Sequence, residues 1–202
     1  MGKGFFDLDG PFNRIATFVF DMIFLNILWL LFSLPIITMG ASTTALFYVI
    51  GKRHRKEDSY LFKDFWKSFK MNFKQATIIW TIILIMAIVT GLNISNAAII
   101  FGKWSSYFII IQGVILLQVL IIGLYIFLLL SRLYLSIASA FKMAFIIGNK
   151  HILTTIICIL LFGILLLAIY IYPPALFFGV VIYVYCSYLL IGRILAQYLP
   201  KE

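Results

Sequence analysis

The sequence predicts an all-α integral membrane protein, with about six transmembrane helices in three hairpins and interfacial amphipathic helices on the cytoplasmic side. The chain has 202 residues, of which 64% are hydrophobic and 11% charged, more apolar surface than a soluble domain of this size can bury. The apolar residues form long runs, and the basic residues gather at the ends of these runs. Nucleic-acid binding, which needs a basic polar face, is therefore not predicted.

The first apolar run is predicted to remain in the protein as a membrane anchor. The first residues lack the pattern of a cleaved signal peptide, and Phe5 to Arg14 mixes aromatic and charged residues as an interfacial segment does. Residues 15–34 then form the first span, because about 20 apolar residues cross a hydrocarbon core of about 30 Å. Pro35 ends this helix, since it has no amide donor.

The second apolar run, residues 36–50, is short for a full crossing. As a helix it would be about 22 Å long, so it is either a short span or a re-entrant arm. The basic loop Lys52 to Lys56 follows at once. Short loops this basic stay on the cytoplasmic side, which favours a crossing.

Residues 60–74 carry aromatic side chains and lysines in separate rows at helical spacing. Such a helix lies in the membrane interface, with its lysines on anionic lipid head groups, or it packs on the cytoplasmic face of the protein itself. A third span, residues 76–92, follows, and the polar run from Asn93 to Asn96 is expected to end it.

Three further spans complete the single membrane domain, residues 1–202: residues 107–130, 152–170 and 175–191. A second cytoplasmic piece, residues 133–150, precedes the fifth span. With six crossings and both termini in the cytoplasm, Lys103 is the one Lys or Arg on the outer side, as the positive-inside rule favours.

Catalytic and metal-binding patterns are not found, so no enzymatic activity and no cofactor are predicted. Of the acidic residues, only Asp21 lies within a predicted span, and neither His54 nor His151 has a neighbour at ligand spacing. Cys158 and Cys186 both lie inside apolar runs, which favours burial over a disulfide or metal site.

An ionisable residue within a span is costly and is a functional candidate by default. For Asp21 we favour a packing role, in which its carboxylate pairs with Arg14 or Arg132, over a proton or cation relay. A relay needs further carboxylates along a path, and the spans offer none.

Small residues between Gly40 and Ala45 have the spacing that lets helix backbones approach closely, so packing against the first span is favoured. The alternative is a polar path for a small solute. That path would be lined by Asp21, Asn26, Gln118, Ser42, Thr43 and Thr44.

Two segments, WLLFSLPIITMGASTTAL at residues 29–46 and SFKMNFKQA at residues 68–76, resemble the YesL family of small bacterial membrane proteins. The second segment contains Asn72 and Lys74, and Arg132 after the fourth span adds to the resemblance. The family implies a bacterial cell membrane location and, because its members are encoded beside carbohydrate ABC importers, an accessory role with their permease subunits. It implies no established activity and no catalytic residues.

The predicted function is therefore that of an accessory or structural membrane protein associated with carbohydrate ABC import. An autonomous small-solute transporter or channel is the alternative.

Overall fold

The computed structural model describes residues 11–198, apart from the side chains of Pro11 and Arg14. The expected interfacial segment from Phe5 to Arg14 lies mostly outside this part of the chain. The described chain is helical, and its α-helices are α1 (Pro11–Ser33), α2 (Met39–His54), α3 (Leu61–Phe101), α4 (Ser105–Arg132), α5 (Ile137–Lys150), α6 (Ile152–Ile171) and α7 (Leu176–Leu195). Short 3-10 turns at Ile36–Thr38, Gly102–Trp104 and Pro173–Ala175 connect three pairs of these helices.

Four segments of the described chain are long and apolar enough to cross a membrane: Ile15–Ser33, Leu61–Arg132, Ile152–Ile171 and Pro173–Leu195. The second of them contains both α3 and α4. The chain is therefore a multi-pass membrane protein by the length and composition of its helices. The α2 helix has 16 residues, or about 24 Å, and is not among these segments.

The turn between α1 and α2 forms where Pro35 stops the first helix, as the sequence predicts. Pro35 has an extended backbone, with φ −75° and ψ 108°. The Thr38 hydroxyl lies 2.6 Å from the Phe32 carbonyl and 2.7 Å from the Pro35 carbonyl, so it can donate to helix-end oxygens that would otherwise have no partner.

The long α3 helix differs from the prediction in two ways. The lysine-bearing residues 60–74 are not a separate interfacial helix, because Leu61 starts a helix that continues without a break into the third apolar run. The polar run from Asn93 to Asn96 does not end it either. Ser95 and Asn96 donate to the Gly91 and Leu92 carbonyls of their own helix, 3.0 and 2.8 Å away, so their polar groups are satisfied without a helix end.

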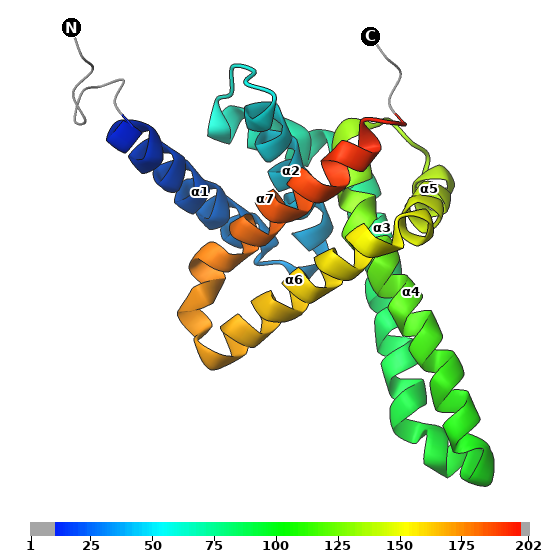
Figure 1. The fold of residues 1–202 in the computed structure, drawn as a ribbon. Helices are drawn as coiled ribbons and strands as arrows, with labels where there is room; N and C mark the ends of the chain where they lie inside the picture. Colours follow the sequence, from blue (N-terminus) through cyan, green and yellow to red (C-terminus); the bar gives the residue numbers. More distant parts are fainter. Residues whose placement is uncertain (1–10, 199–202) are drawn as a thin grey trace, which may run out of the picture.

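Gly102 ends α3, with a φ of +48° that favours glycine. The chain then returns through α4, and Phe101 stacks on Phe108 at the tip of the hairpin, with ring centroids 4.2 Å apart. Figure 1 shows this α3–α4 hairpin projecting well beyond the other helices.

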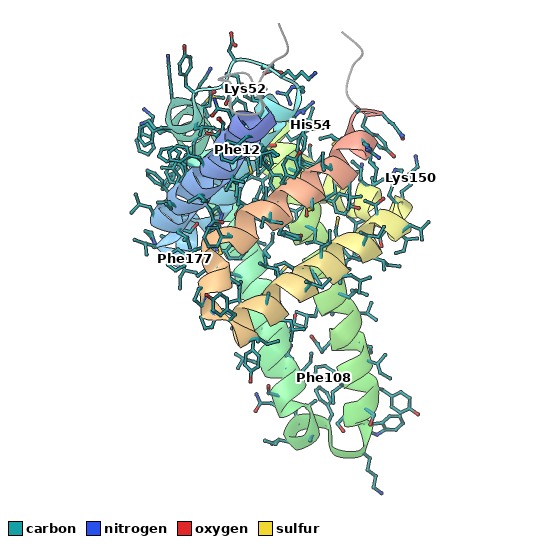
Figure 2. All side chains as sticks on the ribbon, turned by 60° about the vertical axis from the view of Figure 1, so that its left-hand side comes forward. Phe12, Lys52, His54, Phe108, Lys150 and Phe177 are labelled. Atoms are coloured by element: carbon teal, nitrogen blue, oxygen red, sulfur yellow. The ribbon has the colours of Figure 1, made fainter. Side chains whose placement is uncertain are left out.

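The basic loop after α2, the start of α1 and the end of α7 lie towards the end of the molecule opposite the hairpin tip (Figure 1). In Figure 2, Lys52 and His54 lie at that end and Phe108 lies near the other. This arrangement agrees with the predicted separation of the basic loops from the tip that carries Lys103.

The buried core lies in the half of the molecule next to the basic loop. It is formed mainly by α2, whose residues from Gly40 to Gly51 are largely buried, and by the second half of α4. The α6 helix, in contrast to α2, is mostly not buried: Thr155 and Cys158 are its only buried residues. Ile159 and Phe162 are partly buried against the core, and most of the other apolar side chains of α6 are exposed, as expected of a helix with one face towards lipid.

The α2 helix runs back along the first half of α3. Gly40 at its start lies against Ala76 and Trp80, and Lys52 near its end pairs with Asp64. The Trp80 indole also donates to the Ile36 carbonyl in the α1–α2 turn, at 2.8 Å. The turn therefore lies beside Trp80, about halfway along α3.

Candidate functional site

Asp21, the acidic residue within the first span, forms an ion pair with Arg53 at the end of α2. Its side chain is 12% exposed. This partner differs from the two that the sequence suggested. Arg132 instead donates to Tyr188, and the Arg14 side chain lies outside the described part of the structure. The pair joins α1 to α2 near the basic end, so the carboxylate is neutralised within the protein.

Asn26, one turn and a half further along α1, is fully buried and joins this helix to α7. Its amide nitrogen donates to the Leu176 carbonyl at 3.0 Å, and its side-chain oxygen accepts from the Val181 amide at 3.0 Å. Both polar atoms of the side chain are thus satisfied. Asn26 therefore acts as a hydrogen-bonded link between two helices.

The small residues at the start of α2 serve close packing. A Cβ atom on Gly40 would lie 2.6 Å from both the Ala76 carbonyl oxygen and the Trp80 Cβ atom. Thr44 donates to the Gly40 carbonyl at 2.9 Å within the same helix. This is the arrangement expected of small residues at a helix–helix contact.

The neighbouring hydroxyls do not face a common path. Thr43 donates to the Met39 carbonyl at 2.8 Å and accepts from the Trp29 indole at 3.1 Å. The Ser42 hydroxyl is fully buried and has no hydrogen-bond partner among the described residues. The structure therefore does not bring Ser42, Thr43 and Asp21 together as a lining.

The loop after α2 is held by two further ion pairs. Lys52 lies 3.0 Å from Asp64 of α3, and this hydrogen bond raises the pKa of Lys52 above its usual 10.5. Arg55 pairs with Glu57, and the hydrogen bond from the guanidinium lowers the pKa of Glu57 below its usual 4.5. Three of the basic residues at this end are thus neutralised locally.

Tyr188 of α7 is a residue that the sequence did not single out. Its hydroxyl accepts from Arg132 at 2.8 Å and lies 3.4 Å from Arg55, while the His54 ring packs edge-on against its ring with centroids 5.5 Å apart. Tyr188 therefore links α2, α4 and α7. These residues are 56 and 133 positions apart from it, so only the tertiary structure reveals the link.

Asn72 and Arg132, both candidates from the sequence, line one pocket of about 140 Å³ between α2, α3 and the end of α4. Asn72 donates to the carbonyl and the hydroxyl of Ser68, at 3.0 and 3.3 Å. Lys74 is exposed on α3 and is not part of the lining. A second, wider and more open pocket of about 490 Å³ lies between Phe24 and residues 60–63.

Metal ligands are not gathered anywhere in the described chain: no group of three or more His, Cys, Asp or Glu side chains is found there. Cys158 and Cys186 are free thiols. What the polar residues do in this structure is join helices, since Asp21, Asn26, Thr43 and Tyr188 each contact another element. At the pocket beside Arg132, a basic side chain without an ion pair in the described chain lies next to open space.

No curated protein and no solved structure matches the chain. Residues 22–94 match a family described as "Protein of unknown function, DUF624". The matched region runs from Met22 in α1 through α2 to Ile94 in α3. It contains Asn26, the Gly40 contact and Asn72. The similarity to this family therefore covers residues 22–94, a little over a third of the chain.

Proposed function

We propose that this chain is an accessory or structural membrane protein of the bacterial cytoplasmic membrane, associated with the permease subunits of a carbohydrate ABC importer. The accessory role is supported by the polar residues of α1, which are bonded to other parts of the protein. Asp21 is paired and Asn26 is fully hydrogen-bonded between helices, which is the expected arrangement in a packed scaffold. The importer as partner rests on the resemblance to the YesL family alone.

In this proposal the basic loops and both termini are cytoplasmic, and the α3–α4 hairpin crosses the membrane completely. The α3 helix has 41 residues and is about 60 Å long, twice the thickness of the hydrocarbon core, so it can cross the membrane and extend beyond it on the cytoplasmic side. Because the α1–α2 turn lies beside Trp80, it would then remain near the inner half of the bilayer. This supports the re-entrant alternative for residues 36–50.

Cysteine labelling tests the re-entrant arrangement. In a variant without the native cysteines, Ile37→Cys is expected to resist an impermeant reagent added outside intact cells, although Ile37 is 57% exposed in the isolated protein. Trp104→Cys in the α3–α4 turn, where Trp104 is 70% exposed, is the matched control and should react. Equal labelling at both positions would instead indicate a full α1–α2 crossing.

The projecting part of the α3–α4 hairpin offers the partner a large apolar surface. Ile99, Ile110 and Val114 are 85%, 64% and 62% exposed there. Exposed apolar helices suit either lipid or the transmembrane helices of another protein. We assign this surface to the permease because the hairpin lies away from the core and can be approached from several sides (Figure 1).

Purification in a mild detergent tests the association. The importer permeases should co-purify with the tagged protein in a fixed ratio, and Ile110→Trp should weaken their recovery. Leu160→Trp on α6 is a matched control, because Leu160 is 61% exposed and lies on another helix. Recovery of a single, monodisperse protein without permeases would contradict the proposal.

The proposal includes no enzymatic activity. The transporter alternative comes second, because three groups of its suggested path already have partners inside the protein. Thr43 and Thr44 donate to carbonyls of their own helix, Thr43 also accepts from Trp29, and the Asp21 carboxylate pairs with Arg53. Solute uptake into proteoliposomes that contain this protein alone, abolished by Asp21→Asn, would reverse this ranking.

A further inference from the structure

The pocket at Arg132 has a composition suited to an anion. It lies where α2, α3 and α4 approach the basic end of the molecule, and its lining includes Tyr48, Ser68, Asn72, Arg132 and Tyr134. The volume of about 140 Å³ accommodates a group of several heavy atoms. Tyr134 is 93% exposed at one side, so the pocket opens to the surroundings.

Arg132 forms no ion pair within the described part of the chain, and the Glu57 carboxylate, which interacts with it electrostatically, is paired with Arg55. The ion pairs there are Lys52 with Asp64, Arg53 with Asp21 and Arg55 with Glu57, and none includes Arg132. Its guanidinium makes one hydrogen bond, to the Tyr188 hydroxyl. Because a guanidinium carries five N–H donors, four remain for a ligand.

Two hydroxyls add neutral donors. Ser68 is 2% exposed, and its oxygen accepts a hydrogen bond from Asn72, so its own proton is free to be donated into the pocket. Tyr48 makes no hydrogen bond through its hydroxyl among the described residues and lines the opposite side, on α2. Asn72 is a positioning residue here, because its amide orients the Ser68 hydroxyl.

The rim of the pocket is also basic. Met71 lines it from α3, and Lys67 and Lys74, four residues before and three residues after Met71, lie on the same face of that helix. Both lysines are exposed and neither has a carboxylate partner in the described chain. Their combined field favours entry of an anion.

We propose that this pocket binds a phosphate group, carried either by an anionic lipid head group or by a small soluble phosphoester. A guanidinium fork pairs with two phosphate oxygens at once, and the Ser68 and Tyr48 hydroxyls reach the same space. The position at the basic end of the transmembrane helices suits a head group at the cytoplasmic surface. The proposal does not depend on the association with an importer.

The test is a thermal-unfolding titration of the purified full-length protein in a phosphate-free maltoside detergent at constant ionic strength. The probes are inorganic phosphate, glycerol phosphate and short-chain phosphatidylglycerol. Chloride is the control for salt, and short-chain diacylglycerol is the control for a lipid without a phosphate group. Binding to the folded state raises the melting temperature with ligand concentration, and the dependence gives an affinity.

Stabilisation by phosphatidylglycerol alone would identify a lipid as the source of the phosphate, and stabilisation by the soluble phosphates as well would identify the phosphate group itself. In both cases Arg132→Gln should weaken binding by about tenfold or more, because charge-assisted hydrogen bonds are lost. Lys103→Gln removes the same charge at the hairpin tip and should leave the affinity unchanged.

Tyr48→Phe removes a single hydroxyl donor and keeps the ring, so it serves if Arg132→Gln fails to fold, and it should weaken binding severalfold. Tyr188→Phe breaks the Arg132 hydrogen bond outside the pocket lining and should retain most of the affinity. Absence of stabilisation by every phosphate probe would overturn the proposal. So would stabilisation that both Arg132→Gln and Tyr48→Phe preserve.

Discussion

Arg53 at the end of α2 forms an ion pair with Asp21 of α1, across 32 positions of sequence. The two side chains are 28% and 12% exposed, so the pair lies between the fully buried and the surface cases. The Asp21 carboxylate thus has the packing role that the sequence favours, although its partner is Arg53 of the basic loop. This contact fixes the first helix against the second.

Asp21 and Arg53 should each contribute to stability mainly through the other. Asp21→Asn or Arg53→Gln alone should lower the free energy of unfolding by about 1 to 3 kcal/mol, because one charge is left partly buried without a partner. The double variant should lose less than the sum of the two single losses. Unfolding by increasing mole fraction of sodium dodecyl sulfate measures all three. Additive losses would mean that the two residues do not interact.

Gly40 should not tolerate a larger side chain. Gly40→Ala places a Cβ atom 2.6 Å from the Ala76 carbonyl oxygen, so α2 and α3 must separate. The expected loss is about 1 to 3 kcal/mol, as for other overpacked contacts. Gly113→Ala is the matched control, because a Cβ atom there meets nothing within 4 Å. Equal stability of the two variants in the same unfolding assay would show that the close contact is not formed.

Asn26 should contribute more to stability than an asparagine that bonds only within its own helix. Asn26→Ala leaves the Leu176 carbonyl and the Val181 amide without their side-chain partner, at an expected cost of about 1 to 3 kcal/mol. Asn96→Ala removes an exposed side chain that bonds to Leu92 in α3 and should cost little. If Asn26→Ala were as stable as Asn96→Ala, the α1–α7 link would be wrong.

Acid should weaken the loop after α2 through Glu57. Hydrogen bonding by Arg55 holds the pKa of Glu57 below its usual 4.5. The ionised form therefore stabilises the folded state above pH 4.5, and this contribution is lost as the pH falls through the folded-state pKa. Because the Glu57 side chain is 45% exposed, the effect should remain below about 1 kcal/mol.

Glu57→Gln should accordingly show a smaller loss of melting temperature between neutral and acidic pH than the unchanged protein does. Asp58→Asn is the control, since Asp58 is exposed and forms no ion pair in the described chain. An identical pH dependence of Glu57→Gln and the unchanged protein would rule out this role for the Arg55–Glu57 pair.

Local signals in the sequence predict the helices well. Pro35 ends α1, and the pair Pro173 and Pro174 turns the chain between α6 and α7. These features depend on residues that are adjacent in the chain, and so periodicity and proline chemistry reveal them. The continuity of α3 was missed because its polar residues suggest a helix end, whereas Ser95 and Asn96 bond to their own helix.

Contacts between helices were predicted only in part. Close packing at Gly40 follows from the spacing of small residues, although its neighbours Ala76 and Trp80 on α3 do not. The predicted partner of Asp21 was wrong, because the sequence offers several arginines and only the tertiary structure shows that Arg53 is the one in contact. The link that Tyr188 forms between three helices could not be predicted from the sequence, since a tyrosine in an apolar run is typical of any transmembrane helix near the interface.

The proposed topology is tested most directly by finding on which side of the membrane each end of the molecule lies. Lys56→Cys in the basic loop and Lys103→Cys at the tip of the α3–α4 hairpin, each in a variant without Cys158 and Cys186, are to be labelled with an impermeant maleimide. We predict that Lys103→Cys reacts in intact cells and that Lys56→Cys reacts only after the membrane is permeabilised. Labelling of Lys56→Cys in intact cells, with Lys103→Cys protected, would show that the proposed topology is inverted.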